Sequence, residues 1–232
     1  MILKQYMSVG SPVDTHAVPR PEHKVLAGKY VTLVPLKSEH AAALYPQFHG
    51  ENDHVWTFMY EAPFASEEAF QKHIDAKAAS TDPLFFALID NASGKPVGQA
   101  TYMRIDPVNR VIEVGNIIYS PLLQKTPAAT ETMYIMAKYA FELGYRRYEW
   151  KCNALNEPSK RAAPRFGFTY EGTFRQHLIV KGHNRDTAWF SMLDSEWPAH
   201  KAAYEAWLLP SNFDAHGQQL QSLTALRAAG AP

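Results

Sequence analysis

The chain has 232 residues, of which 46% are apolar and 20% are charged, and its 23 Lys and Arg residues balance 23 Asp and Glu residues. This length is enough to bury the core of one large domain or of two small ones. Net charge is zero and no basic stripe stands out. Extended nucleic-acid binding is therefore not expected, because that affinity depends on many contacts of Lys and Arg with phosphates.

The sequence contains no run of about 18 apolar residues, the length typical of a membrane-spanning helix. Its N-terminus lacks the charged start and continuous apolar core of a signal peptide. The single cysteine, Cys152, cannot form an intramolecular disulfide and fits a reducing compartment. We therefore expect a cytoplasmic protein that does not associate with membranes.

Three segments are expected along the chain. Residues 1–25 contain Ser, Gly, Pro and His without periodicity, which predicts a poorly ordered or draped arm. Residues 26–209 carry the periodic patterns of a folded domain. Residues 210–232 are polar and rich in alanine, which predicts a peripheral tail.

Alternating or continuous apolar runs predict strands, and apolar residues spaced by three and four predict helices. In chain order the first elements are a strand at 28–36, helices at 39–48 and 66–78, and a hairpin of strands 84–90 and 96–106. The later elements are a strand at 111–120, a helix at 127–142, a strand at 146–154, a helix at 157–166, antiparallel strands within 168–193 and a helix at 195–208. This order predicts an α/β (α+β) fold with one mixed sheet of about seven strands and helices on both faces. The strand–helix–strand unit at 111–154 is expected to make its two strands parallel.

The loop before the helix at 127–142 is a candidate anion site. The first amides of a helix lack intrahelical partners, and the helix dipole adds to their attraction for an anion. The loop offers small residues, hydroxyls and a positive charge: Ala128 and Ala129, Thr126 and Thr130, and Lys125. An ordinary capped helix explains the same residues equally well.

Two motifs resemble the GNAT superfamily of acyl-CoA N-acyltransferases. Residues 124–129 align with the Q/R-x-x-G-x-G/A loop of that family, and the longer match QKTPAATE is similar to the RimJ/RimL branch of ribosomal-protein N-terminal acetyltransferases. Asn156 and Ser159, followed by Arg165 and the pair Gly167-Phe168, resemble the second block N-x-x-S/A…K/R-x-G-F. The resemblance extends over residues 28–195.

The resemblance implies a V-shaped opening between the two central parallel strands, into which acetyl-CoA would insert as the co-substrate. Its pyrophosphate would lie on the 124–130 loop and its pantetheine would pair with a strand backbone. The oxyanion donor implied is a backbone amide near Ile117, and no metal is expected. The implied cofactor-binding residues are Ile117, Ile118, Tyr119, Gln124, Lys125, Thr126, Pro127, Ala128, Ala129, Thr130, Asn156 and Ser159.

Pro127 departs from the family pattern, which has glycine at this position. Proline removes one amide donor but presets φ for the first turn of the helix. We expect Thr126 or Thr130 to replace the lost phosphate donor.

Acylation of an amine requires a base for the incoming ammonium, a donor for the oxyanion and an acid for the leaving thiolate. By resemblance, Glu113 is the candidate base acting through water, although a salt-bridged strand glutamate explains it as well. The position of the RimL-type glutamate holds Leu178, and the neighbouring His177 could substitute. The usual acid tyrosine is replaced by Ala163, which leaves Ser159 as the catalytic candidate.

Residues 54–64 are aromatic and carry few charges, and by resemblance they form one wall of the acceptor cleft. The substrate-binding candidates are Trp56, Tyr60, Tyr102, Asn116 and His177. A hydrophobic cluster under a loop explains any single ring equally well.

The resemblance therefore implies an N-acetyltransferase that transfers an acetyl group from acetyl-CoA to a primary amine, on a peptide N-terminus or a small molecule, by direct attack in a ternary complex. A ping-pong route is disfavoured because Cys152 has no base near it in the sequence and is expected to be a small buried residue. The alternatives are an acyltransferase that uses another donor, such as succinyl-CoA, and a module that binds acyl-CoA without turnover. A monomer and a homodimer are both compatible with the sequence.

Overall fold

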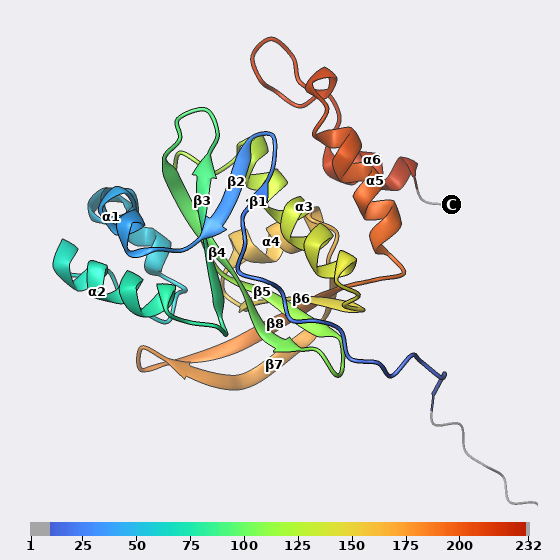
Figure 1. Cartoon of the computed structure of the whole chain (residues 1–232), viewed down its shortest axis with the longest axis horizontal. Helices are drawn as coiled ribbons and strands as arrows, with labels where there is room; N and C mark the ends of the chain where they lie inside the picture. Colours follow the sequence, from blue (N-terminus) through green and yellow to red (C-terminus); the bar gives the residue numbers. More distant parts are fainter. Residues whose placement is uncertain (1–9, 231–232) are drawn as a thin grey trace, which may run out of the picture.

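A computed structural model describes residues 10–230 of the chain (Figure 1). The strands are β1 (Leu26–Ala27), β2 (Val31–Pro35), β3 (Leu84–Asp90), β4 (Pro96–Asp106), β5 (Val111–Tyr119), β6 (Arg147–Asn153), β7 (Thr169–Val180) and β8 (His183–Leu193). The α-helices are α1 (Ala41–Phe48), α2 (Glu67–Ala78), α3 (Pro127–Glu142), α4 (Glu157–Arg165), α5 (Trp197–Trp207) and α6 (Leu223–Ala229). Short 3₁₀ helices are η1 (Ser38–His40), η2 (Gly50–Trp56) and η3 (Pro210–Asn212).

The strands form one eight-stranded mixed sheet in the order β1-β2-β3-β4-β5-β6-β8-β7. Only β5 and β6 pair in parallel among the described strands, and α3 connects them. The predicted mixed sheet with one parallel pair is confirmed. The strand beyond the expected seven is β1, two residues that pair with β2.

Each face of the sheet is covered by its own layer of helices. Side chains alternate between the two faces along a strand, so one strand contributes to both cores. On β3, Leu84, Phe86 and Leu88 belong to the core cluster that includes α3 and α5. Phe85 and Ala87 belong to a second cluster under α1 and α2. Figure 1 shows these two groups of helices on either side of the sheet. The continuous apolar run of β3 thus reflects burial on both faces.

The antiparallel pair β7 and β8 is a long hairpin at the edge of the sheet, seen at the bottom of Figure 1. Lys181 and Gly182 make its turn, with φ values of 49° and 75°. Two consecutive residues of positive φ are typical of a type I′ turn, which matches the twist of paired strands.

Parts of the segment after α5 pack on the domain, although most side chains of residues 210–230 are exposed, as expected for a peripheral tail. Leu223 of α6 is fully buried in the main core. Arg227 donates hydrogen bonds to the carbonyls of Pro164 (2.7 Å) and Arg165 at the end of α4. The contact was not predicted because the segment is rich in alanine and only one of its leucines, Leu223, is fully buried.

Part of the predicted arm crosses the surface of the domain. The Val18 amide donates to the Pro107 carbonyl at 3.1 Å, and a ring nitrogen of His23 lies 2.6 Å from the Phe85 carbonyl oxygen. Residues 1–9 of the arm lie outside the described part of the chain. Residues 18–23 are therefore held along the domain, from the turn after β4 to β3.

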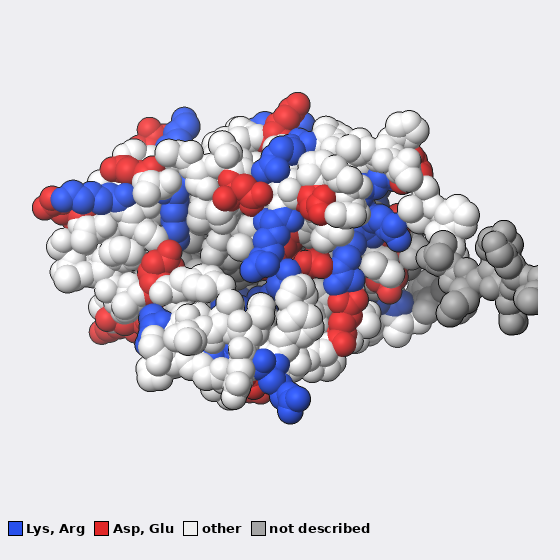
Figure 2. Space-filling model, turned by 90° about the horizontal axis from the view of Figure 1, so that it is seen from below, with Lys and Arg blue, Asp and Glu red and all other residues white. Residues whose placement is uncertain are grey.

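No helix within residues 10–230 combines the length and the apolar character needed to cross a bilayer. On the face shown in Figure 2, Lys and Arg side chains lie interspersed with Asp and Glu side chains. Ion pairs on the surface of the protein include Lys72 with Glu68 (2.7 Å) and Lys160 with Glu157 (2.8 Å).

Candidate functional site

The two parallel strands separate halfway along their length. Their pairing runs from Val111 opposite Arg147 to Val114 opposite Trp150 and stops there, although β5 continues to Tyr119 and β6 to Asn153. Strand ends that lie next to each other without pairing leave backbone donors and acceptors free for a ligand. The separation is the V-shaped opening that the resemblance implies.

A β-bulge shapes β5 where the opening begins. Thr101 of β4 lies opposite Gly115, whereas Gln99 lies opposite Ile118, so β5 carries an extra residue between these positions. Asn116, at the bulge, has a φ of 47°. A bulge changes the direction in which side chains point, so the alternation of side chains along β5 does not continue past Gly115.

A cleft at this opening brings together many of the residues proposed from the sequence. Its walls come from β4, β5, β6, β7, β8, the start of α4 and the segment that follows η2. The sequence-predicted residues that line it are Tyr60, Glu113, Asn116, Ile117, Asn156, Ser159 and His177. The expected catalytic candidates and part of the expected acceptor site are therefore neighbours in space.

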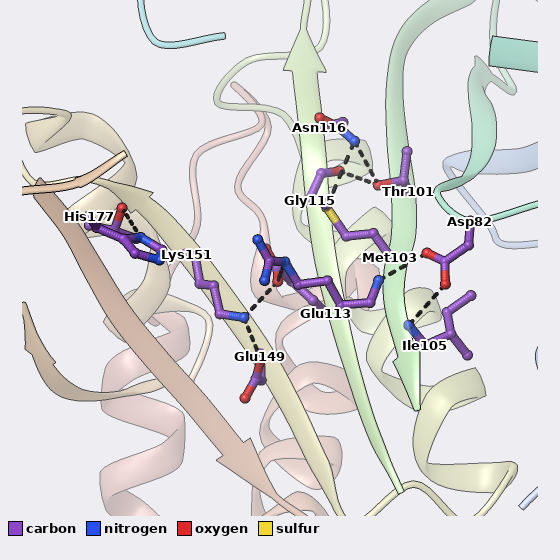
Figure 3. A network of polar contacts seen from close by, with 12 residues as sticks. Asp82, Thr101, Met103, Ile105, Glu113, Gly115, Asn116, Glu149, Lys151 and His177 are labelled. Atoms are coloured by element: carbon purple, nitrogen blue, oxygen red, sulfur yellow. Dashed lines mark hydrogen bonds and ion pairs between the residues drawn. The ribbon is translucent and has the colours of Figure 1, made fainter. Parts of the chain in front are cut away.

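Glu113 is a buried carboxylate held by two cations. Its Oε2 lies 2.8 Å from Lys151 Nζ and 3.2 Å from Arg104 Nε. Figure 3 shows Lys151 between Glu113 and Glu149, which lies 2.7 Å from the same ammonium group. Burial raises the pKa of Glu113 above its ordinary value, and the charge of Lys151 opposes that rise.

The second oxygen of Glu113 faces the cleft. No hydrogen bond among residues 10–230 uses Oε1, whereas Oε2 is the oxygen nearest to Lys151 and Arg104. Gly115 lies next to this oxygen, since a Cβ placed on Gly115 would be 3.7 Å from it and 2.4 Å from Met103 Sδ. A side chain at Gly115 would therefore collide with Met103 at the place where Oε1 is open.

Lys151 was not predicted from the sequence, although a signal was present. The parallel register places Glu113 beside Glu149, and Lys151 follows two residues later on the same face of β6. Two neighbouring carboxylates repel each other unless a cation lies between them. Once the strands are known to be parallel, the cation at 151 follows.

Ser159 has an oriented hydroxyl group at the start of α4. The Asn156 side chain caps this helix by accepting from the Ser159 amide at 3.1 Å. The Trp150 indole donates to Ser159 Oγ at 3.0 Å. Because this oxygen accepts from Trp150, its own hydrogen remains to be donated, and the hydroxyl lies beside both the cleft and the Cys152 thiol.

Cys152 and His177 are the other reactive groups in the lining. Cys152 is buried, as expected, and burial raises the pKa of its thiol, which keeps it protonated. His177 Nδ1 lies 3.0 Å from Thr187 Oγ1, and no hydrogen bond in the described part of the chain uses its Nε2. His177 therefore lines the cleft with one ring nitrogen that no hydrogen bond in the described part of the chain uses.

The loop before α3 lies where β5 has ended, beyond the separated strands. Thr126 caps the helix by accepting from the Ala129 amide at 3.2 Å, and its hydroxyl donates to the Leu123 carbonyl at 2.7 Å. Thr130 Oγ1 accepts from both terminal nitrogens of Arg165 at 3.1 Å. In this conformation the Thr126 hydroxyl hydrogen is used by the Leu123 carbonyl, so Thr126 is not free to donate to a phosphate in place of the amide that Pro127 lacks, and Thr130 is buried with 2% of its surface exposed.

We expect Thr126→Ala to lower the free energy of unfolding by about 1 kcal/mol, because it removes the N-cap of α3. Urea denaturation measures this change. Ser222→Ala removes the corresponding cap of α6, where Ser222 accepts from the Ala225 amide at 3.1 Å, and is the matched control. An unchanged midpoint for Thr126→Ala would show that the helix start is held by other contacts.

Two predicted acceptor residues face the core instead of the cleft. Trp56 is 1% exposed, and its indole donates to the Phe48 carbonyl at 2.7 Å. Tyr102 is fully buried under α3, where its hydroxyl donates to the Met136 carbonyl at 2.6 Å. Both side chains have a polar atom that finds a backbone partner inside the core, which allows complete burial.

Other predicted positions also lie away from the cleft lining. The side chain of Ile118 is buried in the cluster under α1 and α2. Thr126, Pro127 and Ala128 line a separate hollow beside Lys29 and Tyr30. Within residues 10–230, no group of three or more His, Cys, Asp or Glu side chains is arranged to hold a metal ion.

Comparison with known proteins gives consistent matches. The acetyltransferase (GNAT) domain family matches residues 31–169. A GCN5-related N-acetyltransferase of Brucella melitensis, known from a crystal structure, is 52% identical over 91% of this chain and 97% of that chain, with a TM-score of 0.90. A GNAT-family structure from Chromobacterium violaceum ATCC 12472 is 36% identical over 84% of this chain and 100% of that chain, with a TM-score of 0.77.

A curated relative matches over a shorter segment. YdaF of Bacillus subtilis (strain 168), whose name describes a ribosomal N-acetyltransferase, is 32% identical over 109 residues. The match spans 47% of this chain and 59% of that relative, which is less than two thirds of its length.

Proposed function

Because the chain belongs to the GNAT acetyltransferase family, we propose that it transfers an acetyl group from acetyl-CoA to a primary amine. The separated ends of β5 and β6 carry this proposal. They open a cleft that is lined by Glu113 and Ser159. The amine attacks the thioester directly in a ternary complex, and a reduced cytoplasm suits the free thiol of Cys152.

Glu113 acts as the general base in this proposal. Its open oxygen accepts a proton from the ammonium through a water molecule, while Lys151 and Arg104 hold the other oxygen in place. The raised pKa brings the carboxylate closer to the pKa of the group that it deprotonates, which improves proton transfer.

Ser159 and the β5 backbone stabilise the two negative charges of the reaction, on the leaving thiolate and on the oxyanion. The hydroxyl of Ser159, whose oxygen accepts from Trp150, donates its hydrogen to the departing thiolate. The bulge at Asn116 re-aims the backbone beside Ile117, whose amide donates to the oxyanion. Asn156 keeps Ser159 in position through the helix cap.

Direct transfer suits the cleft better than a covalent route through the cysteine. A nucleophilic thiol needs a lowered pKa or an adjacent base. The pKa of Cys152 is raised by burial, so little thiolate forms at neutral pH.

Arg165 supplies positive charge for the phosphates of the acyl donor. Both its terminal nitrogens lie 3.1 Å from Thr130 Oγ1, in the first turns of α3. The charge compensates for the amide that Pro127 lacks and for the Ala129 amide that Thr126 occupies.

Two acceptor classes are compatible with family membership. The name of the B. subtilis relative favours a protein N-terminus, and a small amine is the other class. Alternatives are a donor such as succinyl-CoA, and a module that binds acyl-CoA without turnover.

We expect release of CoA thiol when the protein is mixed with acetyl-CoA and a panel of amines and short peptides. A thiol-reactive dye follows the release, calorimetry follows binding, and succinyl-CoA is run as a parallel donor. Binding of acetyl-CoA without release from any acceptor would favour the module. Failure to bind any acyl-CoA would contradict both readings.

A further inference from the structure

Arg185 is a buried cation in the cleft that lacks an anionic partner. It lies on β8 with 8% of its surface exposed, and its side chain lines the cleft. Its Nε has no hydrogen-bond acceptor, and its guanidinium forms no ion pair with any carboxylate among residues 10–230. Buried arginines are ordinarily paired, because removal of an unpaired charge from water is unfavourable.

The neighbours of Arg185 leave its donors unused. Tyr60 lies against the guanidinium, with 5.4 Å between Cζ and the ring centroid. A cation–π contact attracts the charge but does not use the N–H groups. The adjacent Asp186 accepts instead from the Gln176 amide (2.7 Å) and from Asn184 Nδ2 (3.0 Å).

The remaining charges of the cleft are matched among themselves. Its lining holds three cations, Arg104, Lys151 and Arg185, and one carboxylate, Glu113. Glu113 pairs with Lys151 and Arg104, and Glu149 also pairs with Lys151. Arg185 is thus the cation of the cleft for which a bound ligand would supply the anionic partner.

We propose that Arg185 binds a carboxylate carried by the amine acceptor. The inference rests on the proposed function and names its substrate class: a primary amine with a nearby carboxylate, on a free amino acid or on a peptide with an acidic first residue. A guanidinium binds a planar carboxylate with two parallel hydrogen bonds. The donor phosphates are assigned elsewhere, since none of residues 124–130 lines this cleft.

The test compares acceptors that differ by one charge. Free amino acids are paired with their amides, and Asp-Ala amide is paired with Asn-Ala amide. The enzymes are the wild type, Arg185→Gln and the matched control Arg175→Gln, which removes an exposed arginine of β7 outside the cleft. Release of CoA thiol gives kcat/KM for each acceptor, and circular dichroism confirms that each variant is folded.

The wild type and Arg175→Gln should prefer the charged member of a pair. In Arg185→Gln, kcat/KM for that member should fall about 10- to 100-fold, as expected for loss of hydrogen bonds to a charged group, and the neutral member should change little. Preference for the free amino acid or for the Asp peptide distinguishes the two sources of the carboxylate. The proposal is overturned if no pair favours the charged member, or if the preference survives in Arg185→Gln.

A binding measurement separates this proposal from the proposed function. Calorimetry measures the affinity of N-acetyl amino acids and of their amides for each protein in the presence of CoA. Weaker binding of the acids to Arg185→Gln than to the wild type supports the carboxylate site even if no amine is turned over. Equal binding to the two proteins overturns it, whatever the thiol assay shows.

Discussion

Glu113→Gln should lower kcat by about 100-fold or more, in the range that a positioned general base contributes. The amide keeps the shape of the side chain and can still accept from Lys151, but it cannot take a proton from the ammonium. Binding of acetyl-CoA should change little, because the loop before α3 is untouched. Steady-state kinetics with any acceptor found active, together with calorimetry, measure the two effects.

The matched control is Glu149→Gln. Glu149 pairs with the same ammonium group of Lys151, at 2.7 Å, but does not line the cleft. Its kcat should therefore stay within a few-fold of the wild-type value if proton transfer is the role of Glu113. Equal losses in both variants would instead assign the effect to disruption of Lys151.

The pH dependence of kcat/KM gives an independent check. A general base must be ionised, so activity falls as the pH drops through the pKa of that base. The pKa of Glu113 is raised above its ordinary value of 4.5 by burial, against the opposing charges of Lys151 and Arg104. The acidic limb of the wild-type profile should therefore lie above pH 4.5 and be absent in Glu113→Gln. If the acidic limb of the pH profile persists in Glu113→Gln but disappears in His177→Gln, the base would be His177 on β7.

Local patterns in the sequence predicted the framework of the site well. The hairpin of β3 and β4, the parallel crossover through α3 and the helix that starts at Asn156 each follow from short-range rules. Loop chemistry, helix caps and connection handedness act over a few residues, so they are visible in one sequence. Glu113, Ser159 and His177 could be brought to one cleft on that basis.

The orientation of single side chains was harder to predict, because it depends on long-range packing. Tyr102 lies between Leu84 and Val114 in the sheet, and both neighbours face α3, so its ring is buried there. The bulge at Asn116 changes the register of β5, and the neighbouring Gly115 was the local signal for it that the sequence offered. Arg185 gave no local signal, since its importance comes from the absence of a partner that only the assembled cleft reveals.

Glu131→Gln should produce the largest loss of stability, about 2–4 kcal/mol in the free energy of unfolding, because buried donors are left without acceptors. The Glu131 carboxylate of α3 is 5% exposed and accepts three backbone amides where β2 begins. Oε1 accepts from Lys29 at 2.8 Å, and Oε2 accepts from Tyr30 at 2.6 Å and from Val31 at 3.0 Å. A glutamine has only one acceptor oxygen, so its amide nitrogen must face at least one of these donors.

Urea denaturation of the wild type and the variant measures this loss, and Glu142→Gln is the matched control on the same helix. Glu142 is exposed and lies 3.9 Å from Lys138, a surface pair that is worth at most about 0.5 kcal/mol. An unfolding midpoint for Glu131→Gln as high as that of Glu142→Gln would contradict the prediction. Because Glu131 joins the first turns of α3 to the chain that enters β2, its loss should also loosen the start of α3, where we place the phosphates of the acyl donor.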